Sequence, residues 1–175
     1  MALPNERGKL SGCKNKHATA HRPLTSPCAQ FWFTMRIRAL RGTDYRVAKT
    51  LLAARFSAQD VRQFVALWRH RNPKGSLCIT HLGCIVGIIL LVKNKIEFVA
   101  VHARFGAAGL GSTLVRAALA RLRADFRTVH LVTANSPFLH RWYAKLGFEF
   151  LFTETDAAGV SGDAMIYRFR DKRGT

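Results

Sequence analysis

The sequence predicts one α+β domain whose mixed, mostly antiparallel sheet is flanked by helices. Three observations support this class. Residues 84–92 read CIVGIILLV, an apolar run rich in β-branched residues and far shorter than the roughly 20 residues of a membrane span. Short polar turns bracket that run, as in antiparallel hairpins. Strand-like segments alternate with segments of helical spacing, so the order from residue 35 is β-α-α-β-β-β-α-β-α-β-β.

Residues 1–34 differ in composition from the rest of the chain. They are rich in Lys, Arg, Ser, Pro and His, and Glu6 is their only acid. They hold no apolar segment of a secretory signal, and their arginines are sparse for an organellar transit peptide. We predict a basic, disordered extension before a domain spanning residues 35–175. We expect an intracellular, cytoplasmic protein, with import into an organelle left open.

The charge balance is strongly basic, with 28 Lys and Arg against 10 Asp and Glu and a net charge of +18. Such a field favours polyanionic partners, among them RNA, the ribosome, DNA and phosphate-rich cofactors, and it disfavours polycations. A dispersed basic surface without a specific partner explains the charge equally well. We expect no membrane partner, because no apolar run is long enough to span a bilayer.

The four cysteines predict neither a disulfide scaffold nor a metal site. They are few and scattered for a chain of this length. Cys78 and Cys84 lie in apolar strand patterns, which predicts reduced, buried thiols. The extension has a Cys/His set whose spacing matches no common zinc motif, so we expect no metal there: Cys13, His17, His21 and Cys28.

The first half of the domain predicts a strand, two helices and a three-strand meander. Residues 35–40 (MRIRAL) alternate like a strand. Thr43 and Ser57 are N-cap candidates, and the helix that follows Ser57 ends before Pro73. The two helices and three further strands occupy these segments: 42–56 and 57–71 for the helices, and 76–80, 84–92 and 96–101 for the strands.

The second half predicts a helix, a strand, a second helix and a closing antiparallel pair. The strand covers residues 128–133, and the second helix begins at the N-cap candidate Ser136 and ends near Gly147, where a left-handed residue belongs. Residues 148–154 and 164–170 predict the closing pair. The first helix places four apolar residues on one face: Leu110, Leu114, Ala118 and Leu122.

Two motifs bear on chemistry. Residues 99–115, VAVHARFGAAGLGSTLV, read as a strand, a turn and a glycine loop that opens a helix. Gly106, Gly109 and Gly111 are spaced in the reverse order of the dinucleotide fingerprint, and the preceding meander is not the start of a βαβ unit. Consecutive free N–H groups at such a helix start can surround a pyrophosphate. The second motif is NSPFLHRWYAKLGFEF, residues 135–150.

The element order and these two motifs resemble the GNAT superfamily of N-acetyltransferases over residues 35–170. The resemblance implies acetyl-CoA as cosubstrate, with pantetheine along the strand before the loop and pyrophosphate in the loop. It places the cofactor contacts at ten positions: Val99, Ala100 and Val101 on the strand, Ala107, Ala108, Gly109, Leu110, Gly111 and Ser112 in the cradle, and Asn135 after the next strand.

The resemblance also implies catalytic roles. Acetyl transfer requires a neutral amine, a proton acceptor and a donor for the departing thiolate. Tyr143 matches the family tyrosine four residues before Gly147, which implies that it protonates the sulfur; core packing is the alternative interpretation.

The general base is left open among two residues and a water relay. Glu97 is the only acid of the meander, and the strand period of two predicts that it shares a face with Val99 and Val101. His130 lies five residues before Asn135, where related enzymes place a Glu or His base, and its ordinary pKa suits neutral pH.

We therefore expect an N-acetyltransferase that moves the acetyl group to a primary amine by direct attack. The acceptor is a protein N-terminus, a lysine or a small amine, and a protein amine is weakly favoured. A polyamine would be repelled unless acids such as Asp44, Asp60 or Glu154 form a local patch. The alternative is a catalytically degenerate binding protein, anchored to RNA or the ribosome, because Gly106 stands where the family has a basic residue or glutamine.

Overall fold

The computed structural model describes residues 34–155 and 159–170, so almost all of the predicted basic extension lies outside the described residues. The strands are β1 (Met35–Ala39), β2 (Leu77–His81), β3 (Cys84–Val92), β4 (Lys95–Val101), β5 (Thr128–Ala134), β6 (Glu149–Thr155) and β7 (Ser161–Arg168). The α-helices are α2 (Tyr45–Ala53), α3 (Ala58–Leu67), α4 (Leu110–Leu122) and α5 (Pro137–Lys145). Short 3-10 helices occupy η1 (Gly42–Asp44), η2 (Trp68–His70) and η3 (Ala103–Ala108).

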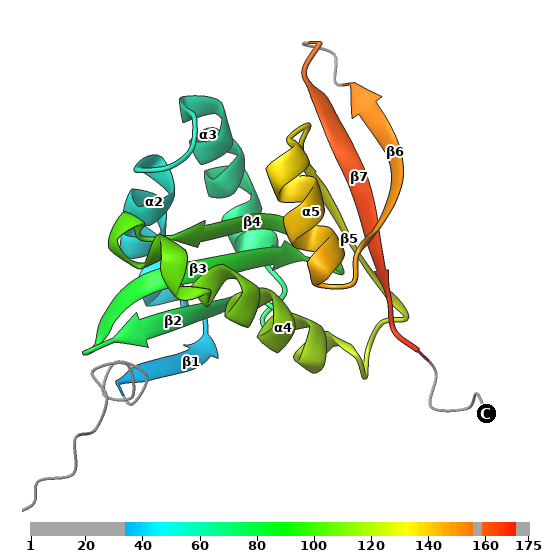
Figure 1. The fold of residues 1–175 in the computed structure, drawn as a ribbon. Helices are drawn as coiled ribbons and strands as arrows, with labels where there is room; N and C mark the ends of the chain where they lie inside the picture. The colour runs from blue at the N-terminus through cyan, green and yellow to red at the C-terminus, as the bar shows by residue number, and fades with distance from the viewer. Residues whose placement is uncertain (1–33, 156–158, 171–175) are drawn as a thin grey trace, which may run out of the picture.

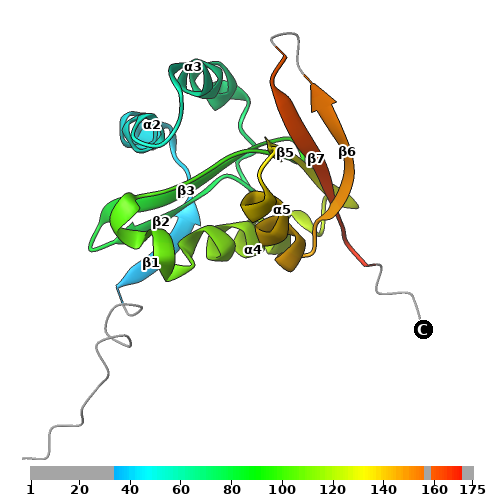
Figure 2. The same ribbon diagram turned by 45° about the horizontal axis from the view of Figure 1, so that its top comes forward.

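The strands form one sheet in the order β1-β2-β3-β4-β5-β7-β6. Every neighbouring pair is antiparallel except β4 and β5, which run parallel. Figures 1 and 2 show α2 and α3 over one face of the sheet, and α4 and α5 over the other. The predicted α+β class and element order are confirmed. Within the described ranges, no helix is both long enough and apolar enough to cross a membrane.

The sheet opens between β4 and β5. These strands pair only at Lys95 with His130 and at Ile96 with Leu131. A β-bulge follows at once, because Leu90 of β3 pairs with Phe98 while the next residue of β3 pairs with Ile96. Glu97 is the extra residue of this bulge, and a bulge bends its strand. The second halves of β4 and β5 therefore separate and leave a gap in the sheet.

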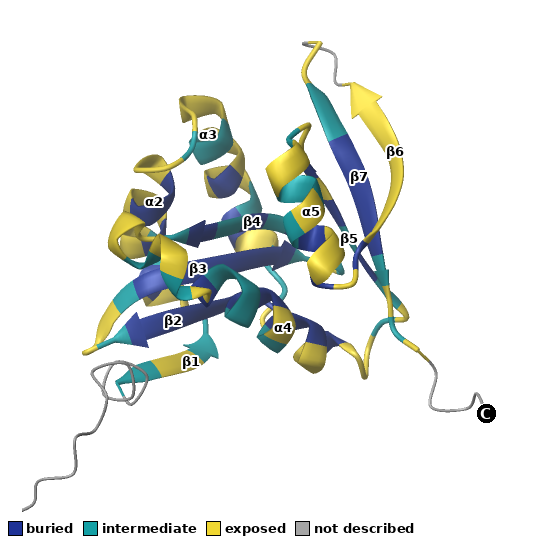
Figure 3. Cartoon of the chain, viewed as in Figure 1, coloured by how far each residue is buried: buried dark blue, intermediate teal, exposed yellow. Residues whose placement is uncertain are grey.

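Each face of the sheet has its own hydrophobic core. On one face, Phe64 packs against Trp68 and Phe98, with ring centroids 5.3 Å and 5.9 Å apart. Figure 3 shows that β2 and β3 are mostly buried, whereas β6 is exposed along its length. On the other face, the core includes the four residues that helical spacing predicts on one side of α4: Leu110, Leu114, Ala118 and Leu122.

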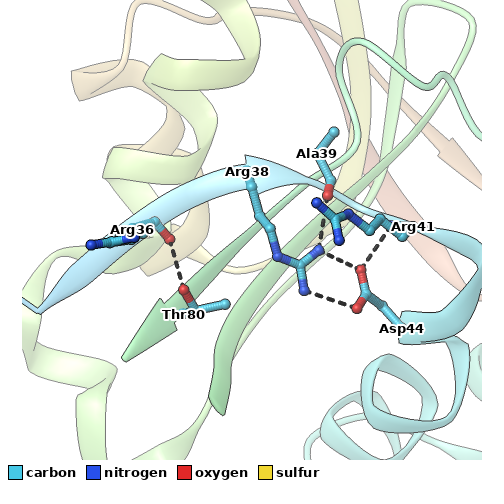
Figure 4. Close-up of polar contacts among 6 residues, drawn as sticks. All are labelled: Arg36, Arg38, Ala39, Arg41, Asp44 and Thr80. Atoms are coloured by element: carbon cyan, nitrogen blue, oxygen red, sulfur yellow. Dashed lines mark hydrogen bonds and ion pairs between the residues drawn. The ribbon is translucent and has the colours of Figure 1, made fainter. Parts of the chain in front are cut away.

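The start of α2 differs from the prediction. Thr43 lies within η1, and the N-cap of α2 is Asp44. The Asp44 carboxylate accepts hydrogen bonds from both terminal nitrogens of Arg38, at 2.6 and 2.9 Å, and from the backbone N–H of Arg41 at 2.7 Å (Figure 4). The Arg38 guanidinium lowers the pKa of this buried carboxyl, and the same hydrogen bonds raise the pKa of Arg38. A charged pair thus replaces the predicted hydroxyl at this helix start.

Three other local predictions have mixed outcomes. Ser57 caps α3 as predicted, because its hydroxyl accepts from the N–H of Asp60 at 3.2 Å. Ser136 is the N-cap residue of α5, but its side chain makes no capping hydrogen bond. Cys78 is buried, whereas Cys84 is exposed, because it follows the two-residue turn at the end of the β2–β3 hairpin. The prediction from the apolar pattern of β3 that its first residue is buried is therefore wrong.

Candidate active site

Two cavities meet at the gap between β4 and β5. The interstrand cavity, of about 490 Å³, lies between these strands and reaches α3 and the β6–β7 hairpin. The helix groove, of about 320 Å³, runs along the second half of β4 to the start of α4 and to α5. The two cavities share four lining residues, which mark their junction: Phe56, Val99, Leu139 and Tyr143.

The second half of β4 forms one wall of the helix groove. Val99, Ala100 and Val101, for which the family resemblance predicts cofactor contacts, all line it. Val99 and Val101 pack against the core on the α4 side, and Ala100 belongs to the opposite core. Beyond Ile96, β4 pairs with β3 on one side and with no described strand on the other. Main-chain N–H and C=O groups on that open edge can bind an extended ligand.

The start of α4 supplies backbone donors at the far end of the groove. Gly109 adopts the left-handed conformation, with φ of 71°, and is the N-cap residue of α4. The first intrahelical bond runs from Thr113 N–H to the Gly109 carbonyl at 3.0 Å. The N–H groups of Leu110, Gly111 and Ser112 therefore have no acceptor within the helix. These three residues belong to the predicted cradle, and their N–H groups are the donors available at the helix start.

Two residues predicted for the cradle do not belong to the helix start. Ala107 and Ala108 lie in η3, the 3-10 helix that precedes Gly109, and neither lines the groove. Gly106 does line the groove, and a Cβ atom there would meet nothing within 4 Å. Gly109 therefore has a left-handed backbone conformation that favours glycine, whereas Gly106 faces open space.

Trp142 of α5 secures the start of α4. Its indole N–H donates to the Ser112 hydroxyl at 3.0 Å. A Cβ atom on Gly111 would lie 3.2 Å from the same indole, which is tighter than ordinary contact. The absence of a side chain at Gly111 therefore lets α4 and α5 pack closely. Trp142 precedes the predicted catalytic tyrosine, but nothing in the sequence pattern indicates this contact.

Tyr143 lies at the junction of both cavities. It is 8% exposed, and its ring contacts Trp142 and Phe148 with centroids 4.6 Å and 5.6 Å away. Among the described residues, none forms a hydrogen bond with its hydroxyl. Burial raises the pKa of Tyr143. The hydroxyl is therefore protonated at neutral pH and available as a donor at the point where the cavities join.

Glu97 lines the interstrand cavity through its position in the bulge. Its side chain is only 10% exposed, and one carboxylate oxygen lies 3.4 Å from the Lys95 ammonium. The predicted period of two does not hold here. Ile96 and Val99 contribute to the same core although they are three residues apart, which strict alternation excludes. The bulge, and not simple alternation, sets the direction of Glu97.

The other base candidate lies apart from the cavities. His130 pairs with Lys95 at the closed end of the gap, and its Nε2 lies 3.1 Å from the Thr128 hydroxyl. It lines neither cavity. Asn135, predicted as a cofactor contact, is exposed and also lines neither. The geometry brings Glu97 and Tyr143 to one cavity and leaves these two residues outside it.

Arg55, Phe56 and Leu139 are among the lining residues that were absent from the predicted site. Arg55 is the one charged side chain among the thirteen described residues that line the helix groove. Phe56 and Leu139 line both cavities at their junction. Arg55 and Phe56 follow the end of α2. Their role depends on how α2 packs over β4, so local patterning could not reveal it.

A model of the acetyltransferase (GNAT) family matches residues 37–148, which run from β1 to the residue before β6. The chain belongs to this family. The protein is accordingly an acyltransferase that depends on acetyl-CoA. A comparison with curated proteins found no match.

Solved structures share the GNAT fold. Ard1 from Thermoplasma volcanium has a TM-score of 0.68 and 21% identity, over 79% of this chain and 99% of that one. PH1933 from Pyrococcus horikoshii OT3 has a TM-score of 0.63 and 19% identity, over 78% and 99%. Aminoglycoside acetyltransferase AAC(6')-Ib, solved with coenzyme A and kanamycin, has a TM-score of 0.57 and 19% identity, over 77% and 94%. At these identities the likeness shows the fold alone.

Proposed function

We propose that the protein moves the acetyl group of acetyl-CoA to a primary amine by direct attack. The observation that carries this proposal is the Tyr143 hydroxyl, which belongs to a buried residue, is protonated and has no described partner where the two cavities meet. The helix groove is the site for acetyl-CoA, and the interstrand cavity is the site for the amine. The acceptor class includes a protein N-terminus, a lysine and a small amine.

The helix groove fits the cosubstrate. The free N–H groups of Leu110, Gly111 and Ser112 are suited to the pyrophosphate, and a Cβ atom at Gly109 would meet nothing within 4 Å, so the approach to them is open. Arg55 adds a positive charge to the groove. The open edge of β4 offers backbone groups to the pantetheine arm. When bound, acetyl-CoA supplies the thioester carbonyl that the amine attacks.

Proton transfer is assigned to two residues of the chain. The Glu97 carboxylate accepts the proton that the amine nitrogen loses, directly or through a water molecule. Tyr143 donates its proton to the departing sulfur, and its raised pKa keeps it in the donor form. His130 has no role in this proposal, because it lines neither cavity.

The test is turnover of purified protein with acetyl-CoA and a panel of amines that includes peptides with free N-termini, lysine peptides and small amines. Release of free thiol and an acetylated product in the mass spectrum are the expected results. Calorimetry measures acetyl-CoA binding separately. If no amine is acetylated and acetyl-CoA does not bind, the enzymatic proposal is wrong.

A second candidate function is binding of a nucleic acid or the ribosome, and a basic hollow at the other end of α4 favours it. The hollow, of about 630 Å³, is lined by Arg123, Arg127 and Arg170, with the half-buried rings of Phe126 and Phe169 beside them. Guanidinium groups bind phosphates, and aromatic rings stack on unpaired bases. The hollow lies at the opposite end of α4 from the cradle, so both functions are compatible.

The test of this candidate is RNA binding over a range of salt concentrations. Replacing the three arginines by glutamine should weaken binding of a single-stranded RNA and reduce the slope of log affinity against log salt by about 2. An unchanged slope would assign RNA binding, if any, to another surface. Acetyl transfer of the same variant shows whether the two functions are independent.

A further inference from the structure

The interstrand cavity is acidic although the protein is strongly basic. Of its sixteen described lining residues, three are acids, Asp60, Glu97 and Glu154, and one is a cation, Lys95. No arginine is among them. The whole chain carries 28 Lys and Arg but only 10 Asp and Glu, so three of its ten acids gather around one cavity. Acids therefore outnumber cations around this cavity, whereas cations outnumber acids in the chain as a whole.

The charges of two of these acids are not neutralised by a described cation. Asp60 accepts hydrogen bonds from the N–H and hydroxyl of Ser57, which are neutral donors, at 3.0 and 2.7 Å. Glu154 forms no ion pair within the described ranges. By contrast, three of the four described acids outside the cavity have cationic partners: Asp44 with Arg38, Asp125 with Lys74, and Glu149 with Arg168. The fourth, Asp163, is buried on β7 and accepts a hydrogen bond from the Thr153 hydroxyl at 2.9 Å.

The three acids approach the cavity from different walls. Asp60 lies in the first turn of α3, Glu154 lies near the end of β6, and Glu97 lies on β4. Tyr143, at 8% exposure, adds an unpartnered hydroxyl to the lining of the same cavity. The cavity therefore has a reacting end at Glu97 and Tyr143, and two uncompensated carboxylates on its other walls.

We propose that the acceptor is a small amine with at least two ammonium groups, such as an aliphatic diamine or polyamine. This proposal rests on the proposed acetyl transfer and names its substrate class. Asp60 and Glu154 bind the ammonium group that does not react, while Glu97 and Tyr143 act at the other end of the molecule. The carboxylates are specificity residues, and no catalytic role is assigned to Asp60 or Glu154.

Size distinguishes a small polyamine from a basic protein. Salt screens charges over about 8–10 Å, so a molecule inside the cavity is affected mainly by the nearby carboxylates. A large basic protein would face the whole +18 surface and be repelled. The acidic cavity thus removes the expected repulsion for a small polycation, but not for a lysine-rich protein.

Acetyl transfer to such an acceptor conserves atoms and protons. The neutral end of the diamine forms a C–N bond with the acetyl carbon as the thioester C–S bond breaks. The nitrogen loses one proton to Glu97, and the sulfur takes one proton from Tyr143. Glu97 then releases its proton to solvent, and Tyr143 takes a proton from solvent. The products are one monoacetylated diamine and one free thiol.

The experiment compares 1,4-diaminobutane with n-butylamine, which has the same carbon chain but a single amine. We expect wild-type kcat/KM to be at least tenfold higher for the diamine, and we expect this ratio to fall at least fivefold in the double variant Asp60→Asn/Glu154→Gln. Asparagine keeps an oxygen that can accept the Ser57 N–H. Glu149→Gln is the matched control, because it removes one charge from β6 at a residue that lines neither cavity.

The possible results test the proposed substrate class and the proposed acetyl transfer separately. Turnover of both amines without a diamine preference, or a preference that survives the double variant, overturns the substrate class and leaves acetyl transfer intact. If neither amine is acetylated, calorimetry with 1,4-diaminobutane decides the substrate class: binding that the double variant weakens supports it, and no binding overturns it. Circular dichroism and thermal unfolding check that each variant is folded.

Discussion

Replacing Tyr143 by phenylalanine separates catalysis from stability in this protein. The substitution removes one oxygen atom and keeps the ring that contacts Trp142 and Phe148 at centroid distances of 4.6 and 5.6 Å. No described hydrogen bond is lost, because the hydroxyl has no described partner. We therefore expect the free energy of unfolding to change by less than about 1 kcal/mol.

The expected effect on catalysis is much larger. A positioned general acid contributes about 10²- to 10⁴-fold to a rate, and each factor of ten corresponds to about 1.4 kcal/mol of activation free energy. We expect kcat to fall by a factor in that range, or roughly 3–5 kcal/mol. The KM for acetyl-CoA should change by no more than about threefold, because the groove binds it mainly through backbone groups and not through this hydroxyl.

The assay measures free thiol release at saturating acetyl-CoA, with thermal unfolding of the same preparations. Tyr167→Phe is the matched control, since Tyr167 is a half-buried tyrosine of β7 that lines neither cavity. Because burial raises the pKa of Tyr143, wild-type activity should show no loss from ionisation of this group as pH approaches 10. If Tyr143→Phe keeps kcat within threefold of wild type, Tyr143 is not the proton donor.

The other predictions concern stability. Gly106→Ala should stabilise the protein by about 0.4–1 kcal/mol, because a Cβ atom meets nothing there and φ is not positive. Gly109→Ala should destabilise the protein by at least about 1 kcal/mol, because φ at this residue is 71°. Urea midpoints of both variants equal to that of the wild type would contradict both predictions. Ser57→Ala should cost about 1 kcal/mol through the lost helix cap, seen as a lower melting temperature. The hydrogen bond from Arg38 lowers the pKa of Asp44 from 3.8. The ionised Asp44 carboxylate therefore stabilises the fold above pH 3.8, and this stabilisation is lost as pH falls through the lowered pKa. The Asp44→Asn variant should be less stable than the wild type at pH 7, and its acid unfolding curve should lack this pH-dependent loss.

The elements of the fold could be predicted from local patterns. The apolar run of β3, the four-residue face of α4 and the capping pair at Ser57 each depend on neighbours a few positions away. Tyr143 was predicted from the motif around it, and the structure places it where two cavities meet. Thr43 failed as a cap because Asp44 forms a charged pair with Arg38, on a different element.

Properties that depend on strand pairing could not be predicted. β7 lies between β5 and β6, although it follows both in the sequence. The bulge at Glu97 appears only when β3 and β4 are aligned, and it overrides the alternation that local reasoning assumes. His130 fits a pattern for a base in the sequence, yet pairing with Lys95 holds it at the closed end of the gap.

The order of elements, the glycine-containing helix start and the total charge of +18 follow from the amino-acid sequence, because they depend on composition and on neighbouring residues. The positions of the charges in space depend on how the chain folds. Asp60, Glu97 and Glu154 belong to α3, β4 and β6, and they line one cavity because the sheet opens between β4 and β5 beneath α3 and the β6–β7 hairpin. An acidic cavity in a basic protein is therefore a product of long-range packing, which no local pattern contains.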